Sequence, residues 1–391
     1  MTDNRYTAAR VRDLPAYLFA EIDRRKAAAA RAGRELISFG TGNPDLPTPE
    51  PVVDELVRAA RDPANHRYPD FYGLPEFRRA VADHYARRFG VALDPDTQVL
   101  PLIGSKDGIA HLPWAVTDPG DPVLVCEPAY PVYEVGARLA GARPVHVHLR
   151  AADDWFPDLD AIDPRLAADA RILWLCYPSN PTAAVAGLDQ LEGAVRFASW
   201  HRVLLAYDNA YSELTYDGFV APSVLQVPGA DEVAVEFGTL SKTFNMTGWR
   251  LGWMVGNREV VAALGRLKTN IDSGVFNAVQ RAGVAALDGG MPHLPDLVAT
   301  YQRRRDLIVG SFRKLGWDLP TPRGAMYVWL PTPPGESSVA FTARLLDQAG
   351  VVVAPGTGYG PSGEGYVRLT LAIPDARVEA GCERILGALA T

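Results

Sequence analysis

Cysteine is scarce in this sequence: the chain has three, Cys126, Cys176 and Cys382, and they are far apart. Zinc sites need cysteine or histidine ligands at short, paired spacings, and disulfide frameworks need more cysteines than this. We therefore expect no metal site and a reducing compartment. In this interpretation the three thiols are small apolar side chains of the core.

Long apolar runs and an excess of positive charge are missing as well. No segment approaches the ~18 apolar residues of a membrane-spanning helix, and the N-terminal MTDNRYTAARVRDLP lacks the apolar centre of a signal peptide. The formal net charge is −7, whereas a nucleic-acid-binding protein has a basic face. These absences predict a cytoplasmic protein whose partners are neither membranes nor nucleic acids.

What the chain does contain is typical of a globular α/β protein. Its 391 residues are 48% hydrophobic and 22% charged, and this length suits two domains at roughly 100–200 residues each. Short runs that are apolar on both faces alternate with helical patterns, as in a mainly parallel sheet flanked by helices. The runs span residues 97–103, 121–128, 170–178, 201–208, 233–237 and 250–256.

The pattern changes after about residue 285. From there the sequence predicts a long amphipathic helix, an alternating strand, a second helix and a second strand, at residues 297–316, 325–330, 337–350 and 365–373. We interpret residues 46–284 as a large α/β domain and residues 285–391 as a smaller α+β domain. Residues 1–45 are assigned to the smaller domain, because the sheet pattern begins only after them.

Lys242 lies in an unusual setting, because GTLSKTFNMTGWRLGW (residues 238–253) surrounds it with apolar side chains. A lysine is usually a solvated surface charge. Pressed against apolar groups and near a cation, it loses its proton more readily and can form a Schiff base with a carbonyl. Arg250 offers a charged fork and Thr239 a hydroxyl, which both suit a phosphate. Pyridoxal phosphate is a ligand that carries both a carbonyl and a phosphate, so it fits these three side chains.

This coenzyme makes further demands that other strand ends can meet. An acidic group must keep the pyridine nitrogen protonated. Asp208 ends the run 201–208 and could do this, although an aspartate in this position, taken alone, is more often an ordinary helix N-cap. Tyr211 and Asn180 could reach the ring oxygen, although Asn180 also suits an ordinary Asn-Pro turn.

The phosphate and the ring face have candidates too. LIGSKDGIA places Gly104, Ser105 and Lys106 between a strand and a helix, and a helix N-terminus offers N–H groups and positive potential to an anion. A glycine-containing turn of this kind is a weak signal by itself. Tyr130, just after the run 121–128, could stack on the ring, although it also suits the start of an ordinary helix.

In their order along the chain, these segments resemble the fold-type I, class I/II aminotransferases of the aspartate aminotransferase superfamily. The resemblance covers nearly the whole length and is carried by GTLSKTFNMTGWRLG, YPSNPT and YDNAYSE together. It implies a mainly parallel seven-stranded sheet and pyridoxal 5'-phosphate as cofactor. The implied contacts are the Schiff base for Lys242, the ring nitrogen for Asp208, the ring oxygen for Tyr211 and Asn180, the ring face for Tyr130, and the phosphate for Ser105, Lys106, Thr239 and Arg250.

Three further assignments rest on the resemblance alone. RYPDFYGLPEFR is similar to the family segment whose tyrosine, here Tyr68, reaches the phosphate of the neighbouring subunit in a homodimer with shared active sites. GEGYVRLTLAI is similar to the segment whose arginine, here Arg368, binds the α-carboxylate of the substrate, which a guanidinium matches in two places. FGTGNPDLPTP provides Gly42, which is expected at the substrate together with Asn180.

Within the family, LPAYLFAEI, LIGSKDGIAHL, FGTLSKTFNMTGWR and NIDSGVFNAVQRAG resemble the LL-diaminopimelate aminotransferases. We therefore expect a ping-pong transfer of an amino group from an L-amino acid, with a diaminopimelate-like donor favoured, to a 2-oxo acid such as 2-oxoglutarate. Aspartate, alanine, aromatic and N-succinyl-diaminopimelate donors stay open, because Ala183 and Asn43 depart from the usual family residues near the site. The side-chain pocket is sought at residues 267–277, Tyr17, Phe39 and Tyr72.

Two other functional classes are alternatives. A cystathionine-type β-lyase, or an enzyme that closes a ring from S-adenosylmethionine, would use the same lysine and aspartate. A lyase would be distinguished by pyruvate and ammonia formed without an acceptor. A coenzyme-binding regulator would carry an added DNA-binding module, for which the chain has neither spare length nor a basic segment.

Overall fold

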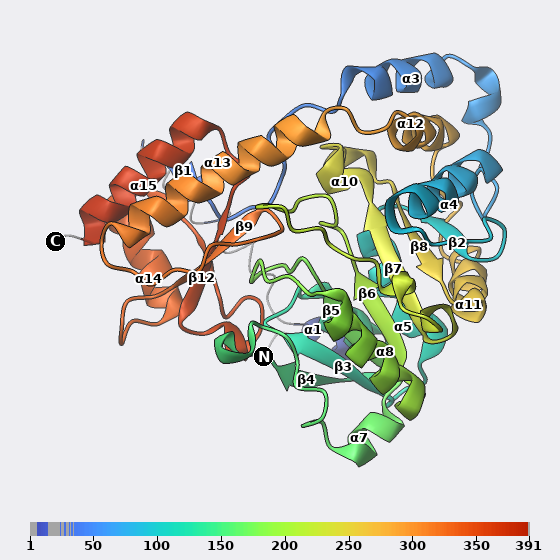
Figure 1. The fold of residues 1–391 in the computed structure, drawn as a ribbon, viewed down its shortest axis with the longest axis horizontal. Helices are drawn as coiled ribbons and strands as arrows, with labels where there is room; N and C mark the ends of the chain where they lie inside the picture. Colours follow the sequence, from blue (N-terminus) through green and yellow to red (C-terminus); the bar gives the residue numbers. More distant parts are fainter. Residues whose placement is uncertain are drawn as a thin grey trace.

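The computed structural model describes residues 6–14, 24, 27–28, 31, 33 and 35–389. Seven strands of this part form one sheet in the order β2-β8-β7-β6-β5-β3-β4 (Figure 1). All neighbours are parallel except where β8 pairs with β2 and β7, so the mainly parallel α/β sheet is confirmed. The strands are β2 (Val99–Leu102), β3 (Pro122–Glu127), β4 (Arg143–His148), β5 (Ile172–Cys176), β6 (Leu204–Asp208), β7 (Ala234–Thr239) and β8 (Gly252–Gly256).

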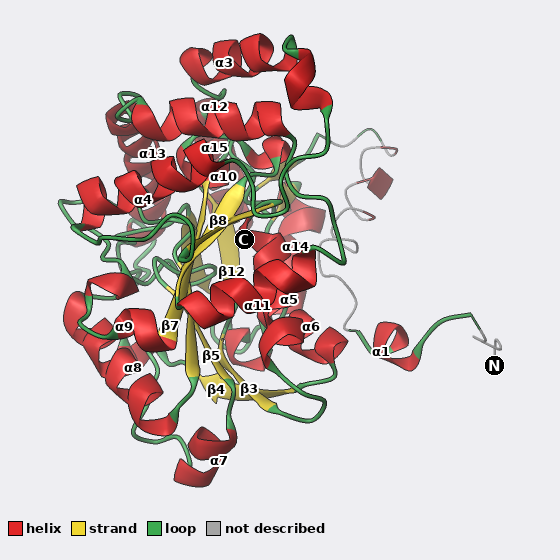
Figure 2. Cartoon of the chain, turned by 90° about the vertical axis from the view of Figure 1, so that its right-hand side faces the viewer, coloured by secondary structure: helices red, strands yellow, loops and turns green. Residues whose placement is uncertain are grey.

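Helices cover both faces of this sheet (Figure 2). Successive residues of a strand point to opposite faces, and in β5 Leu173 and Leu175 join one core while Ile172 and Trp174 join another. Because both faces are buried, these strands read as continuous apolar runs. The first core is covered by α4 (Pro75–Phe89), α8 (Leu188–His201) and α12 (Asn277–Asp288), and the second by α5 (Ser105–Val116), α6 (Val132–Ala140) and α11 (Arg258–Lys268).

Strand β4 has no counterpart among the apolar runs of the sequence. It lies at the edge of the sheet and pairs only with β3, so its residues are exposed or half-buried. The polar side chains of Arg143, His146 and His148 interrupt the apolar pattern there. An edge strand with this composition gives no continuous apolar signal.

A second, antiparallel sheet has the order β11-β12-β9 and encloses a separate core with three helices. The helices and strands expected between residues 297 and 373 are found here, with ends shifted by a few residues. The exception is α14, which continues into a π-type turn at Leu345–Ala349. The elements are α13 (Leu294–Arg313), β9 (Tyr327–Pro331), α14 (Ser338–Arg344), β11 (Ala354–Pro355), β12 (Tyr366–Thr370) and α15 (Asp375–Leu389).

Part of the N-terminal region lies beside this second group, because β1 (Ile37–Ser38) pairs in parallel with β10 (Val351–Val352). The domain boundaries at residues 45/46 and 284/285 stay a prediction. No helix in the described ranges combines the length and the apolar character that crossing a bilayer requires. The remaining helices are α1 (Ala9–Arg12), α3 (Glu50–Ala60), which packs on α12 (Figure 1), α7 (Pro164–Asp169), α9 (Ala230–Val233) and α10 (Leu240–Thr243).

Candidate active site

A cavity of about 680 Å³ lies where the central strands β5, β6 and β7 end. This is the edge at which open α/β sheets bind ligands. The cavity takes side chains from the large sheet and from strands β9 and β12 of the second sheet. The predicted site residues that line it are Gly42, Ser105, Lys106, Tyr130, Asn180, Asp208, Tyr211, Thr239, Lys242, Arg250 and Arg368.

Lys242 reaches the cavity from α10, the short helix that directly follows β7. Burial, together with the nearby positive charges of Arg368 and Arg250, lowers the pKa of Lys242 to about 8. Its Nζ donates a hydrogen bond of 3.0 Å to the carbonyl oxygen of Gly42. The shift raises the unprotonated share of this amine at neutral pH far above that of an exposed lysine, and the unprotonated amine can act as a nucleophile or a base.

Asp208 is the last residue of β6 and is buried. Its Oδ2 accepts a hydrogen bond of 2.7 Å from the hydroxyl of Tyr133, whereas its Oδ1 has no partner among the described residues. Burial raises the pKa of Asp208 to about 6, although the Tyr133 hydroxyl, the backbone of Ala210 and the charge of Lys242 act in the opposite direction. A buried acceptor without a donor is rare in proteins, so this oxygen fits a ligand N–H such as a protonated ring nitrogen.

The N-terminus of α5 forms a cationic cradle at the other end of the cavity. Burial and the charge of Arg250 lower the pKa of Lys106, which is on the first turn of this helix. Gly104, which precedes the helix, has a φ of +75°, and a Cβ there would overlap the Arg250 guanidinium. Only glycine therefore lets the backbone N–H groups of the helix and the two cations face one anion, which suits a phosphate.

Thr239 lines the cavity, but its hydroxyl already has partners. It caps α10 by accepting a bond of 3.1 Å from the backbone N–H of Ser241, and it lies 3.2 Å from the carbonyl oxygen of Leu251, to which it can donate. Ser241, which also lines the cavity, supplies a second hydroxyl that sequence analysis missed. The segment GTLSKTFNMTGWRLG contains this serine, so the signal was present.

Arg368 is buried on β12, where strand pairing holds it opposite Trp329 of β9. Its Nη1 donates to Asn180 Oδ1 at 2.6 Å. The Cζ atom of its guanidinium lies 4.1 Å from the ring centroid of Tyr327 and 4.9 Å from that of Tyr359. The hydroxyls of Tyr327 and Tyr211 are 2.9 Å apart. The guanidinium is thus held in a fixed plane for a carboxylate.

Several predicted residues lie elsewhere. Tyr68 does not line this cavity, and 88% of its surface is exposed. Phe39 is fully buried in the second core, and Tyr72 packs against Gly265 of α11. Neither of these, nor residues 267–277, lines the cavity, and Tyr17 falls outside the described residues.

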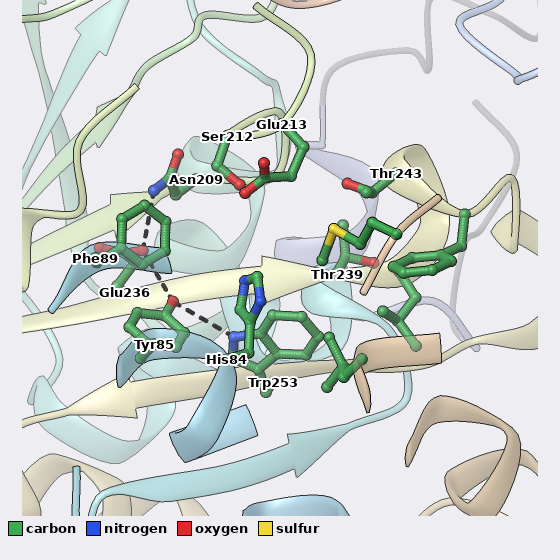
Figure 3. A pocket seen from close by; sticks show the side chains of 15 residues that line it. His84, Tyr85, Phe89, Asn209, Ser212, Glu213, Glu236, Thr239, Thr243 and Trp253 are labelled. Carbon is green, nitrogen blue, oxygen red and sulfur yellow. Dashed lines mark hydrogen bonds between the residues drawn. The ribbon is translucent and has the colours of Figure 1, made fainter. Parts of the chain in front are cut away.

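A buried polar network joins Tyr85, Asn209 and Glu236 beside the ends of β6 and β7 (Figure 3). The carboxylate of Glu236, on β7, accepts hydrogen bonds from Tyr85 at 2.8 Å, from Asn209 at 2.9 Å and from the Ser223 hydroxyl at 2.6 Å. These donors oppose the effect of burial, which raises the pKa of Glu236. Since Asn209 follows Asp208 in the chain, this network also fixes the backbone at Asp208.

Comparisons with known proteins agree with this geometry. The family model described as aminotransferase class I and II matches residues 34–385. The LL-diaminopimelate aminotransferase of Dehalococcoides mccartyi is 49% identical over 376 residues, covering 96% of this chain and 97% of the relative. That of Moorella thermoacetica is 50% identical, with 97% of each chain covered.

Solved structures show the same fold. Substrate-bound BacF from Bacillus subtilis has a TM-score of 0.93 at 34% identity, with 97% of each chain covered. A probable N-succinyldiaminopimelate aminotransferase from Thermus thermophilus has a TM-score of 0.90 at 37% identity, with 95% of this chain and 100% of that chain covered. The cationic cradle, the nucleophilic amine and the unsatisfied carboxylate oxygen all fit the coenzyme of this family. The chain therefore belongs to the class I and II aminotransferases and is a pyridoxal 5'-phosphate-dependent enzyme of fold type I.

Proposed function

We propose that this aminotransferase takes the amino group of LL-diaminopimelate, or of a closely related L-amino acid, and transfers it to 2-oxoglutarate by a ping-pong mechanism. Relatives with this printed activity are 45–50% identical over nearly their whole length. The observation that carries the proposal is the placement of Lys242, Asp208 and Arg368 in one cavity. A base, a carboxylate for the ring nitrogen and a fork for the substrate carboxylate are what transamination needs.

Each group has a proposed task. When bound, pyridoxal phosphate withdraws electrons from the substrate Cα–H bond. Arg368 binds the α-carboxylate. Lys242 takes the proton from the substrate Cα as a general base and then, as a general acid, delivers it to the coenzyme. Asp208 Oδ1 accepts from the ring nitrogen. Asn180 gives its oxygen to Arg368, so its amide N–H groups can donate to the ring oxygen. Tyr130 stacks on the ring.

The phosphate is assigned to the N-terminus of α5. Ser105 and Lys106 contact it together with Arg250, and Gly104 provides the close approach of the backbone. The hydroxyl of Thr239 lies 3.0 Å from that of Ser241 and can donate to it, which would leave the Ser241 hydroxyl free to donate to the phosphate.

We further propose a homodimer with shared active sites. The side chain of Tyr68 is exposed, and Phe71, Tyr72, Ile271 and Phe276 are 38–51% exposed. The segments that carry them meet where Gly274 lies against Pro69, and we propose that they form one face. A second copy that covers this face would bring Tyr68 to the phosphate of its neighbour. A protein that is a monomer at its working concentration, yet fully active, would contradict this arrangement.

The two groups of elements are proposed as a large domain (residues 46–284) and a small domain (residues 1–45 and 285–391) that close over the substrate and exclude water. A cytoplasmic location is proposed as well. Cys126, Cys176 and Cys382 are free thiols, as expected in a reducing compartment.

The test is a panel of amino donors, mixed with the purified protein and 2-oxoglutarate, in which glutamate formation is measured. We expect the highest kcat/KM with LL-diaminopimelate. A Lys242→Ala variant should form no glutamate, and borohydride reduction should leave no coenzyme covalently attached to it. A higher value with aspartate, alanine, an aromatic amino acid or N-succinyl-diaminopimelate would reassign the donor. Pyruvate and ammonia formed without an acceptor would indicate a lyase instead.

A further inference from the structure

The position of Tyr327 in the cavity has no counterpart in the sequence prediction. Tyr327 is on β9, is 2% exposed and lines the cavity. In the register of β9 and β12 it pairs with Thr370, whereas Arg368 pairs with Trp329. Tyr327 and Arg368 are therefore diagonal neighbours on one face of the sheet, within reach of an aromatic and a long side chain.

Tyr327 makes two separate contacts there. Its ring lies under the guanidinium of Arg368, with 4.1 Å between Cζ and the ring centroid. Its hydroxyl lies 2.9 Å from that of Tyr211. A Cβ at Gly42 would overlap the phenol of Tyr327, so the glycine at this position makes room for the hydroxyl.

We propose that Tyr327 is a positioning residue that serves both ends of the substrate site. Its hydroxyl donates to Tyr211 and thereby turns the single Tyr211 proton toward the ring oxygen of the coenzyme. Its ring fixes the plane of the Arg368 guanidinium for the α-carboxylate. This proposal rests on the proposed function, since it assigns the ring oxygen to Tyr211 and the carboxylate to Arg368.

The direction of the Tyr327–Tyr211 hydrogen bond has a measurable consequence. A hydroxyl that accepts one hydrogen bond becomes a stronger donor in the next. Loss of the proton from the lysine–coenzyme linkage increases the negative charge on the neighbouring ring oxygen. A donor at this oxygen favours the deprotonated form, and so lowers the pH midpoint at which the visible absorbance of the bound coenzyme changes.

Tyr327→Phe removes the hydroxyl and keeps the ring, so it tests the first contact in the holoenzyme without substrate. We expect the absorbance midpoint to rise by a few tenths of a pH unit, on the order of 0.1–0.7. Tyr211→Phe should raise it further. In the Tyr211→Phe background, Tyr327→Phe should have no additional effect, because the hydroxyl acts through Tyr211.

A midpoint that falls in Tyr327→Phe would show that Tyr211 donates to Tyr327, and would overturn the proposal, as would an unchanged midpoint. The matched control is Tyr216→Phe, because the Tyr216 hydroxyl is also buried in this core but donates to the Ala325 carbonyl oxygen, away from the cavity. This variant should leave the midpoint unchanged. If the wild-type protein shows no coenzyme absorbance at all, the proposed function fails instead, so the two failures are distinguishable.

Tyr327→Leu removes the ring as well and tests the second contact. A desolvated cation–π contact of this kind predicts a KM for the amino donor raised about 5- to 30-fold, with kcat changed much less. The dissociation constant of an unreactive carboxylate such as succinate, followed through coenzyme absorbance, should rise in parallel. Tyr327→Phe should change both constants less than 2-fold. Equal effects of the Phe and Leu variants on KM would refute the role of the ring.

Discussion

Replacing Asp208 by asparagine should favour the variant apoenzyme over the wild type increasingly as the pH rises toward neutral, although it removes the carboxylate that we propose for the ring nitrogen of the coenzyme. The pKa of Asp208 is raised from 3.8 to about 6 by burial. A group whose folded pKa is raised contributes stability that is fully present below its unfolded pKa and is lost as the pH rises through its folded pKa. The wild-type apoenzyme therefore loses up to about 3 kcal/mol between pH 3.8 and pH 7 because of this carboxylate.

Asparagine does not titrate, and its oxygen can keep the hydrogen bond from Tyr133. Any cost of burying its amide group is the same at all pH values. The observable is therefore how the difference in unfolding free energy between variant and wild type changes with pH. Measured by urea denaturation at equal protein concentration, it should shift in favour of the variant by about 2 kcal/mol between pH 4 and pH 7.5.

The holoenzyme provides the control for this reasoning. If the protonated ring nitrogen of the bound coenzyme pairs with Asp208, as we propose, the charged carboxylate would no longer be a cost and the advantage of the variant should disappear. A difference between variant and wild-type apoenzyme that does not depend on pH would refute the claim that Asp208 is held with a raised pKa.

Three further changes test the surroundings of the site. Gly104→Ala should weaken coenzyme binding about 10-fold or more, because the positive φ and the overlap with Arg250 strain the cationic cradle. An unchanged dissociation constant of the coenzyme in an absorbance titration would argue against that cradle. Glu236→Gln places an N–H group against the donors Tyr85 and Asn209, which then lack an acceptor. The unfolding free energy should fall by about 2–3 kcal/mol. A loss below about 0.5 kcal/mol would mean that the network rearranges freely. Lys268→Met removes the buried partner of Asp107. The free energy of unfolding, measured with denaturant, should fall by about 3–5 kcal/mol, and by less at a pH low enough to protonate the carboxylate. A loss that is the same at all pH values would contradict the ionic origin of the effect.

The placement of site residues in one cavity could be predicted from sequence where it depends on local features. Lys242 and Asp208 each directly follow or end an apolar strand, and parallel strands bring their carboxyl ends to one edge of the sheet. The apolar run before each residue therefore predicted that Lys242 and Asp208 lie in the same cavity, although they are far apart in the sequence. The family resemblance added Arg368 and Gly42, for which local patterns gave only an ordinary strand arginine and a turn glycine.

The partners of these groups could not be predicted in the same way. Tyr133 reaches Asp208 from α6, which packs on one face of the sheet, and no sequence pattern records the angle at which that helix packs. Tyr327 meets Arg368 because of the register between β9 and β12, and a shift by one residue would turn its ring to the other face. The strand that contains Tyr327 was predicted from its alternating pattern. The pattern alone does not show which face of that strand lines a cavity.

The electrostatics of the cavity explain why these hidden partners matter. Lys106, Lys242, Arg250 and Arg368 line it, and among the described residues Asp208 is the one carboxylate that they face. Burial acts on both signs of charge by favouring the neutral forms of Lys242 and Asp208. Without an anionic ligand this arrangement is unfavourable. A ligand that brings a phosphate to the cations and an N–H to Asp208 relieves both costs, and any such ligand stabilises the folded state by mass action. The coenzyme should therefore raise the stability of the protein more at pH 7.5 than at pH 5, since Asp208 is largely neutral at the lower value.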